Sequence, residues 1–331
     1  MKILICDADQ ECRDAFSTLA AEHELTFVEG PISDAGIAAH SDAEILSVFV
    51  SSRVSAAQID ALPHLKLIVA RSTGVDHIDV THAKERNITI VNVPKYGART
   101  VAEYAFALML TLTRKLHVSL HRVRNDNDFS IAGLEGFDLA GKTLGVVGTG
   151  AIGRTVSLIA QAFGMRVLMS DKYPDHSLEN ASAQYVPLAE LLKSSDIVTL
   201  HVPYLPENHH LINADTLTQM RRGAIIINTA RGELIDTKAL LESLKSGYLG
   251  GAGLDVLEGE RLLKDEFELV EHNAPTDELA AVVRDRVLIE LPNVVVTPHV
   301  AFFSREAYRE ILTVSIADIR QFAAGSPVNL V

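Results

Sequence analysis

Short β-branched runs alternate with stretches of helical length along the first hundred residues. Several of these runs are continuously apolar, which is typical of strands in a parallel sheet that helices cover on both faces. The segments between them, such as residues 10–21 and 55–62, have the length and composition of helices. The pattern predicts an N-terminal α/β unit with strands at residues 2–7, 25–29, 44–50, 66–71 and 88–93.

A long apolar stretch follows this unit. Thr100 opens a predicted helix, with Glu103 three residues later in the arrangement of a capping box. Residues 101–116 are apolar on nearly every face, so we expect a buried helix that joins two domains. The polar residues 125–136 are expected to form a loop.

A second series of strands and helices begins at Lys142, and it predicts a second parallel sheet. The charged residues 258–291 look like an insertion over the sheet edge, with a helical run at 278–286. The last predicted helix, residues 305–324, is expected to pack back on the first unit. The strands expected in this sheet are residues 143–148, 166–171, 197–201, 224–228, 250–256 and 293–297.

Composition narrows the class of protein. A chain of 331 residues, of which 47% are hydrophobic and 22% charged, is typical of a globular protein of about two domains. The net charge of −13 opposes binding to phosphate backbones and anionic lipid, so neither nucleic acid nor a membrane is an expected partner. The N-terminal apolar run is too short for a secretory signal, and the most apolar helical stretch is too short to span a membrane. We expect a cytoplasmic protein.

Cysteines and histidines indicate no metal centre. Cys6 and Cys12 are the only cysteines, too few for a disulfide scaffold or a four-thiolate site. The 13 histidines include no metal-ligand spacing such as HExxH, and the pair His209 and His210 falls in a polar turn. No metal is therefore expected.

A glycine triplet indicates a nucleotide. Gly148, Gly150 and Gly153 form G-x-G-x-x-G directly after a predicted strand and at the start of a helix. In this motif the first glycine makes a tight turn, the second lets backbone amides approach a pyrophosphate, and the third lets the helix pack closely on the strand. The helix N-terminus supplies unpaired amides and partial positive charge for the phosphates. An ordinary strand-to-helix turn is the alternative.

The end of the next strand strengthens the dinucleotide interpretation. Asp171 stands 18 residues beyond Gly153, where a carboxylate can accept both hydrogen bonds of an adenosine ribose. This carboxylate also repels a 2′-phosphate, so NAD is favoured over NADP. Lys172 is interpreted as a solvated surface residue.

Three charged residues follow buried strands of the second sheet, at the edge where open α/β sheets bind ligands. They are Arg231 in NTARGELID, Glu260 in GLDVLEGE and His299 in VTPHVAFF. Taken singly, each has an ordinary alternative: a surface ion pair, a solvated charge run and a hydrogen-bonded histidine after a strand.

Seven motifs, in order along nearly the whole chain, resemble the D-isomer-specific 2-hydroxyacid dehydrogenases, most closely the D-lactate dehydrogenase branch. The resemblance implies two Rossmann-like, doubly wound α/β domains with the active site in a cleft between them. A flavodoxin-like substrate domain would comprise residues 1–99 and 299–331, and an NAD-binding domain residues 100–298. The motifs are RSTGVDHID from Arg71, VPKYGARTVAE from Val93, the glycine triplet, HVPYLPEN from His201, NTARGELID from Asn228, GLDVLEGE from Gly253 and TPHVAFF from Thr297.

The resemblance implies a role for each charged residue. Arg231 would hold the substrate carboxylate and polarise the 2-keto oxygen with its planar guanidinium. His299 would donate a proton to that oxygen as hydride arrives from NADH, and take it back in the oxidation direction. Glu260 would hydrogen-bond to His299 and favour its protonated form.

Further contacts are implied by the same resemblance. Thr73 and Gly74 would bind the substrate carboxylate through backbone amides, and Tyr96 and Phe302 would line the side-chain pocket, although both could equally be core residues. The cofactor would be contacted, besides the glycines, Asp171 and Arg231, by Ala151, Ile152, Val202, Pro203, Asn208, Thr229, Ala230 and Asp255.

The expected activity is therefore an NAD-dependent D-2-hydroxyacid dehydrogenase that interconverts pyruvate and D-lactate, working as a homodimer. Residues 75–77 and 96–98 follow the D-lactate pattern only partly, so phenylpyruvate or a branched-chain keto acid stays open as substrate. A second alternative is an NAD-sensing corepressor with the same fold. A third is the formate dehydrogenase branch, which has Gln where Glu260 stands.

Overall fold

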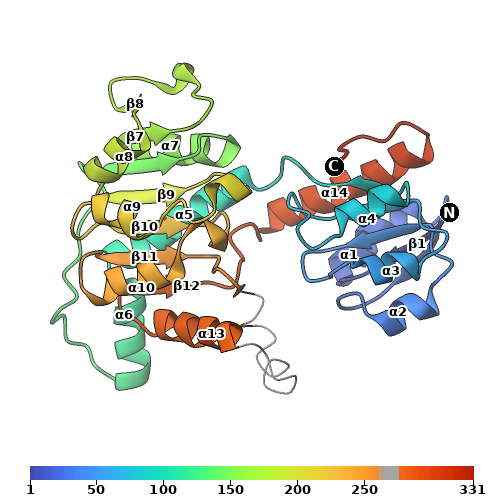
Figure 1. Cartoon of the computed structure of the whole chain (residues 1–331), viewed down its shortest axis with the longest axis horizontal. Coiled ribbons are helices and arrows are strands. Elements are labelled where there is room, and N and C mark those ends of the chain that lie inside the picture. The colour runs from blue at the N-terminus through green and yellow to red at the C-terminus, as the bar shows by residue number, and fades with distance from the viewer. Residues whose placement is uncertain (261–262, 264–275) are drawn as a thin grey trace. The chain divides into compact units, whose positions relative to one another are not determined.

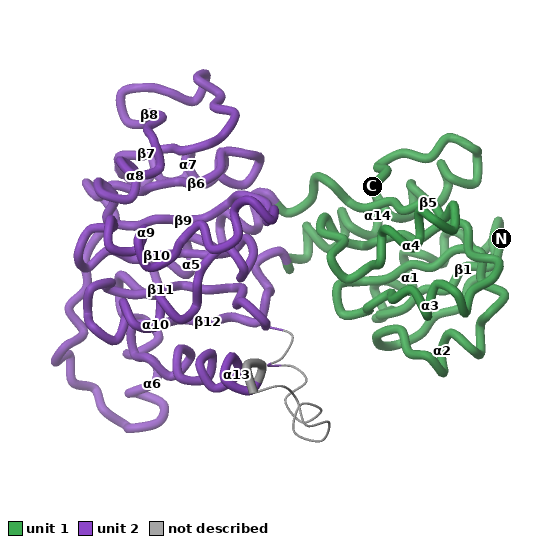
Figure 2. Tube along the Cα trace, viewed as in Figure 1, with its two compact units in different colours: residues 1–97, 303–331 green, residues 98–302 purple. Residues whose placement is uncertain are grey.

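The computed structural model describes residues 1–260, 263 and 276–331. The chain divides into two compact units, unit 1 with Met1–Gly97 and Phe303–Val331, and unit 2 with Ala98–Phe302 (Figure 2). The second boundary falls after residue 302 rather than 298, because the amides of residues 299–301 are hydrogen-bonded to Asp255 of unit 2.

Unit 1 contains a five-stranded parallel sheet. The strand order is β2-β1-β3-β4-β5, which reverses direction between β1 and β3 as in flavodoxin-like folds. All five strands expected from the sequence are confirmed, each somewhat shorter than its apolar run. Their bounds are β1 Lys2–Ile5, β2 Glu24–Phe27, β3 Ile45–Val48, β4 Leu67–Ala70 and β5 Thr89–Val91.

Helices cover both faces of this sheet. Along β1 successive side chains alternate: Ile3 and Ile5 pack with α1 and α14, and Leu4 packs on the opposite face with α2, α3 and α4. The prediction that the last helix packs on the first unit is confirmed. The helices are α1 Gln10–Phe16, α2 Asp34–Ala39, α3 Ala56–Asp60, α4 Val80–Glu85 and α14 Arg305–Ala323 (Figure 1).

Unit 2 contains a seven-stranded parallel sheet in the order β12-β11-β10-β9-β6-β7-β8. The order reverses between β6 and β9, the kind of switch point at which doubly wound sheets bind ligands. Six strands were expected, and the seventh, β8, is a short outer strand. The bounds are β6 Thr143–Val147, β7 Arg166–Ser170, β8 Ala183–Tyr185, β9 Ile197–Leu200, β10 Ile225–Asn228, β11 Gly251–Leu254 and β12 Val294–Val296.

Two apolar cores lie on the two faces of this sheet. Leu144 and Val146 of β6 pack against α5 and α7, whereas Val147 faces the core that α8, α9 and α10 cover. These helices are α5 Ala98–Thr113, α7 Ala151–Ala162, α8 Leu188–Ser194, α9 Ala214–Gln219 and α10 Thr237–Lys245; α6 is Leu116–His121 and α13 is Thr276–Ile289 (Figure 1).

Two expectations are revised. The capping box at Thr100 is wrong: α5 begins at Ala98, so Thr100 lies inside the helix, and the Glu103 carboxylate accepts a hydrogen bond from Nε of Arg99 at 2.7 Å. The expected insertion at residues 258–291 includes residues 261–262 and 264–275, which lie outside the described residues, and its helical part, α13, is longer than expected. Within the described part of the chain, no helix is both long and apolar enough to cross a membrane.

Candidate active site

Six loops of unit 2 leave the sheet at the same edge. Because its strands are all parallel, and all but the outer strand β8 are in register at their last residues, their carboxyl ends meet there. Every site residue predicted in this unit follows one of these strands. The first predicted residue after each is Gly148 after β6, Asp171 after β7, Val202 after β9, Thr229 after β10, Asp255 after β11 and His299 after β12.

The three glycines differ in what surrounds them. Gly148 has a φ of +90°, and a Cβ there would lie 2.7 Å from the carbonyl of His201. A Cβ on Gly153 would lie 1.9 Å from the Gly148 oxygen, so the third glycine is required for helix α7 to pack against the turn. Around Gly150, in contrast, nothing lies within 4 Å of the Cβ position. The second glycine therefore borders open space, as backbone contact with a phosphate requires.

The start of α7 suits an anion. Gly150 is its N-cap and provides no side-chain acceptor for the first amides of the helix. These amides and the helix dipole are available to a negatively charged group. Ala151 is exposed and Ile152 half-buried at this end.

Asp171 is held as a carboxylate. Its Oδ2 accepts hydrogen bonds from the amide and hydroxyl of Thr149 at 2.6 and 3.0 Å, and its Oδ1 accepts from the Tyr173 amide at 2.8 Å. Burial alone would raise the pKa of Asp171, but these hydrogen bonds outweigh it and keep the pKa below its ordinary value. Lys172 is exposed, and its Nζ lies 3.4 Å from Oε1 of Glu207.

His299 and Glu260 form a direct pair. Nδ1 of the imidazole lies 2.7 Å from Oε1 of the carboxylate, and both side chains are about a third exposed, at 33% and 31%. His299 has a φ of +54°, in the left-handed region, which a residue with a side chain adopts only where its surroundings hold it.

Asp255 holds this turn. Its buried carboxylate accepts hydrogen bonds from the Thr297 hydroxyl at 2.5 Å, the Val300 amide at 3.0 Å and the Ala301 amide at 2.8 Å. Burial raises the pKa of Asp255, and these bonds offset part of that rise. Sequence reasoning missed this anchoring role because the partners lie more than forty residues further along the chain. The cofactor contact expected of Asp255 stays a prediction.

Arg231 lies on a loop that is fixed to its neighbours. The buried Asn228 side chain donates to the Arg231 carbonyl at 2.8 Å and accepts from the Ala230 amide at 3.0 Å. A Cβ on Gly232 would lie 2.1 Å from the backbone of Leu257, so this glycine lets the loop after β10 touch the loop that carries Glu260. The three predicted catalytic residues thus lie on neighbouring loops of one sheet edge.

The predicted substrate residues fall in both units. Thr73 and Gly74 follow β4 in unit 1, where the Thr73 hydroxyl donates to the Val93 carbonyl at 2.8 Å. Tyr96 is half-buried in the segment after β5. In unit 2 the ring of Phe302 meets the ring of His299 edge-on, with centroids 6.3 Å apart.

The segment after β9 was expected to contact the cofactor. Val202 is half-buried and Pro203 exposed, and the Asn208 amide donates to the Pro203 carbonyl at 2.8 Å, which closes the loop on itself. Two buried polar atoms at this edge, Oγ1 of Thr229 and Nδ1 of His201, have no hydrogen-bond partner among the described residues. With the open Gly150, the bare helix N-terminus and the ionised Asp171, the residues present fit a dinucleotide.

Comparison with known proteins agrees with this geometry. The family model described as D-isomer specific 2-hydroxyacid dehydrogenase, NAD binding domain, matches residues 106–301. The D-lactate dehydrogenase of Escherichia coli is 36% identical over 307 residues, which cover 91% of this chain and 90% of that protein. The solved pyruvate reductase of Chlamydomonas reinhardtii has a TM-score of 0.88 and 34% identity, covering 99% and 98% of the two chains. The D-lactate dehydrogenase from Aquifex aeolicus, complexed with NAD and lactic acid, has a TM-score of 0.85 and 34% identity, covering 98% and 96%.

Proposed function

The chain belongs to the D-isomer-specific 2-hydroxyacid dehydrogenase family, and from this we propose that it interconverts pyruvate and D-lactate with His299 as acid and base. It is an oxidoreductase that acts on CH–OH groups, and its cofactor is NAD. The choice of pyruvate rests on the similarity to a pyruvate reductase and to D-lactate dehydrogenases.

The pair of His299 and Glu260 is the observation that carries the proposal. With Glu260 ionised, Nδ1 of His299, 2.7 Å from Oε1, is the nitrogen that donates, because a carboxylate can only accept a hydrogen bond. The other ring nitrogen, Nε2, is then the one that exchanges a proton with substrate. We assign Glu260 the role of orienting this ring and His299 the role of the acid in keto-acid reduction.

The reaction follows from these assignments. NADH, when bound, supplies the hydride that forms the new C–H bond at C2 of the keto acid. Arg231 binds the carboxylate of the substrate and draws charge toward the 2-keto oxygen. His299 transfers its Nε2 proton to that oxygen, so that an N–H bond breaks and the O–H bond of the product forms. In the reverse direction Nε2 accepts the proton.

We assign the selection of substrates by side-chain size to two aromatic residues, Phe302 and Tyr96. Phe302, whose ring meets that of His299, offers an apolar surface beside the acid. Tyr96 is proposed to contact the substrate side chain as well. Thr73 and Gly74 of unit 1 are proposed to bind the substrate carboxylate through their amides. A methyl group such as that of pyruvate needs little space there, and each added methylene changes preference by about 1 to 3 kcal/mol.

The nucleotide is assigned to unit 2. The pyrophosphate would lie at Gly150, Ala151 and Ile152, because the start of α7 is uncapped there. The adenosine ribose would hydrogen-bond to Asp171. The remaining contacts are proposed for Val202, Pro203, Asn208, Thr229, Ala230, Arg231 and Asp255.

We also propose a cytoplasmic homodimer. Phe129 and Ile131, in the irregular segment after α6, are 79% and 87% exposed, which suits burial against a second copy. Light scattering tests this directly: twice the chain mass is expected, and a monomer that persists at high concentration contradicts it.

A panel of 2-keto acids of increasing size, followed by NADH consumption and chiral analysis of the product, tests the function. We expect the highest kcat/KM with pyruvate and a D product. A higher value with phenylpyruvate or a branched-chain keto acid would reassign the substrate, and an L product would contradict the proposed activity. Tight NADH binding with negligible turnover would favour a binding protein, and formate-dependent NADH formation would favour the formate dehydrogenase branch.

A further inference from the structure

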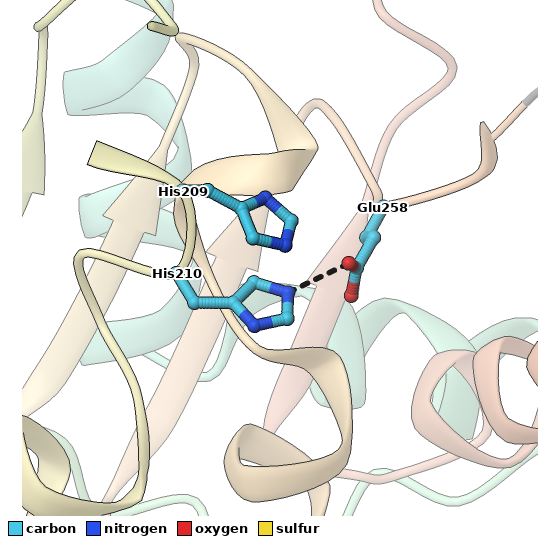
Figure 3. Close-up of side chains that lie close together, drawn as sticks. All are labelled: His209, His210 and Glu258. Atoms are coloured by element: carbon cyan, nitrogen blue, oxygen red, sulfur yellow. Dashed lines mark hydrogen bonds and ion pairs between the residues drawn. The ribbon is translucent and has the colours of Figure 1, made fainter. Parts of the chain in front are cut away.

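Three side chains converge outside the His299 and Glu260 pair. His209 and His210 follow β9, and Glu258 follows β11. Nε2 of His210 lies 2.7 Å from Oε1 of Glu258, and the two imidazole rings stack with centroids 3.8 Å apart and an interplanar angle of 23°. One nitrogen or oxygen atom from each residue lies within 4.8 Å of the others. Figure 3 shows the two rings and the carboxylate directed toward one another.

The backbone makes this convergence possible. Successive side chains of an extended segment point to opposite sides, which would separate two adjacent histidines. His210, however, has a φ of +51°, and this left-handed turn places its ring beside that of His209. The conformation is held by hydrogen bonds from the His210 amide to the Glu233 carbonyl at 2.9 Å and from the Asn213 amide group to the His210 carbonyl at 3.0 Å.

A second hydrogen bond orients the carboxylate of Glu258. The hydroxyl of the buried Thr237, at the start of α10, donates to Oε2 of Glu258 at 3.3 Å. Oε1 of the same carboxylate faces His210. The side chains of His210 and Glu258 are 30% and 28% exposed, while His209 is exposed. The cluster is therefore partly shielded from water and still open to an ion from the side of His209.

We propose that His209, His210 and Glu258 bind one divalent transition-metal ion of the Zn²⁺ type. Two imidazole nitrogens and one carboxylate oxygen are a known ligand set for Zn²⁺, with water in the remaining position. Mg²⁺ and Ca²⁺ prefer oxygen ligands alone, so this set discriminates against them. On a tetrahedral ion with bonds of about 2.1 Å, the ligand atoms are about 3.4 Å apart, which rotations of these side chains can reach.

The support for the carboxylate matches what metal sites use. Ligating carboxylates are themselves hydrogen-bonded, and such partners orient the ligand and raise affinity. Thr237 fills that position for Glu258. The cluster contains none of the residues assigned to hydride or proton transfer, so the proposal does not depend on the proposed function.

Zn²⁺ titration of the tag-free, chelator-treated full chain tests the site, by calorimetry at neutral pH. We expect one ion per chain, with affinity at least about tenfold weaker in His209→Gln and in Glu258→Gln. His176→Gln is the matched control: His176 is an exposed histidine paired with a carboxylate, Glu179, at 2.8 Å, and its loss should leave the affinity unchanged. NADH binding of each variant verifies that it is folded.

A second measurement uses Co²⁺ as a spectroscopic substitute. The visible absorption of bound Co²⁺ should appear in the wild-type protein and in His176→Gln, and be lost in Glu258→Gln. The proposal is overturned if the wild-type chain binds no stoichiometric Zn²⁺. It is equally overturned if His209→Gln and Glu258→Gln bind Zn²⁺ as tightly as the wild type.

Discussion

The amide of His299 donates a 2.8 Å hydrogen bond to the backbone carbonyl of Asp255, whose carboxylate accepts from the next two amides along the chain. One buried aspartate therefore holds both ends of the turn that presents the proposed acid. The turn keeps His299 in the left-handed region, an arrangement that costs about 1 to 3 kcal/mol without such support.

Replacing Asp255 by Asn should loosen this turn. The side-chain amide of Asn has an NH₂ group in place of one of the two carboxylate oxygens of Asp255. At least one of the donors that this carboxylate binds therefore loses its hydrogen-bond acceptor. We expect the free energy of unfolding to fall by about 1 to 3 kcal/mol, as measured by urea denaturation. Thr297→Val removes a single hydrogen bond to the same carboxylate and should cost only about 1 kcal/mol. Equal losses in the two variants would contradict the anchoring role.

Substitutions at two glycines of the motif should affect NADH affinity and the stability of the fold separately. Gly150→Ala places a methyl group in open space, so the free energy of unfolding should change by less than about 1 kcal/mol, whereas NADH should bind about tenfold more weakly. Gly153→Ala places its methyl group against a backbone oxygen and should destabilise the fold by about 1 to 3 kcal/mol.

Gly30→Ala is the control for both glycine variants, because nothing lies within 4 Å of its Cβ position and it is in unit 1. It should leave stability and NADH affinity unchanged. Unchanged NADH affinity in Gly150→Ala would argue against a pyrophosphate at the start of α7.

Removing the imidazole should stop the chemistry and spare the fold. Asn tolerates left-handed backbone, so His299→Asn keeps the turn but has no group that can transfer the proton. We expect kcat to fall by about 10² to 10⁴ with NADH affinity unchanged. Glu260→Gln should cause a smaller loss, since it weakens the support of the acid and keeps the acid itself. Turnover close to that of the wild type in His299→Asn, measured by NADH consumption, is incompatible with the proposed mechanism.

Asp318 in α14 should make stability depend on pH. Burial raises its pKa to about 6, and the hydrogen bond that Oδ1 accepts from Asn329 at 2.8 Å offsets part of the rise. In the unfolded chain an aspartate has a pKa of about 3.9, so between the two values the folded state binds a proton that the unfolded state does not. The charged Asp318 therefore destabilises the fold above pH 6, and this penalty disappears as the pH falls from about 7 to about 4.

The variant Asp318→Asn should lack this dependence. Urea denaturation at several pH values is expected to show that the stability difference between wild type and variant narrows as the pH falls. The exposed Asp215→Asn serves as control and should run parallel to the wild type. Parallel curves for Asp318→Asn would show that the buried carboxyl does not titrate in this range.

Local patterns predicted much of unit 2. The continuous apolar run of β6 ends in Gly148, and strand, turn and helix start are all encoded within a dozen residues. The same holds for Asn228 to Arg231, because a buried strand that ends in polar residues indicates the ligand edge of a parallel sheet. Such features need no knowledge of distant segments.

Contacts between segments that lie far apart in the chain could not be predicted from local sequence patterns. Nothing near Asp255 indicates that its carboxylate binds the backbone at Val300, 45 positions later, and His210 and Glu258 are 48 positions apart. Strand β8 was missed because it has one fully buried residue, Ala183, and so lacks a strand-like pattern. The start of α5 was misplaced because the Glu103 carboxylate could accept a hydrogen bond either from the Thr100 amide, as in a capping box, or from the Arg99 side chain. In the structure it accepts from Arg99.

The division of unit 1 into two pieces affects how the chain is synthesised. Helix α14 contributes Tyr308, Leu312 and Ile319 to the core beneath β1, and all of unit 2 is encoded between these segments. All of unit 2 is therefore synthesised, and can fold, before helix α14 is made to cover one apolar face of the unit 1 sheet. During that interval the apolar side chains of Ile3 and Ile5 lack the part of their cover that α14 provides in the finished fold.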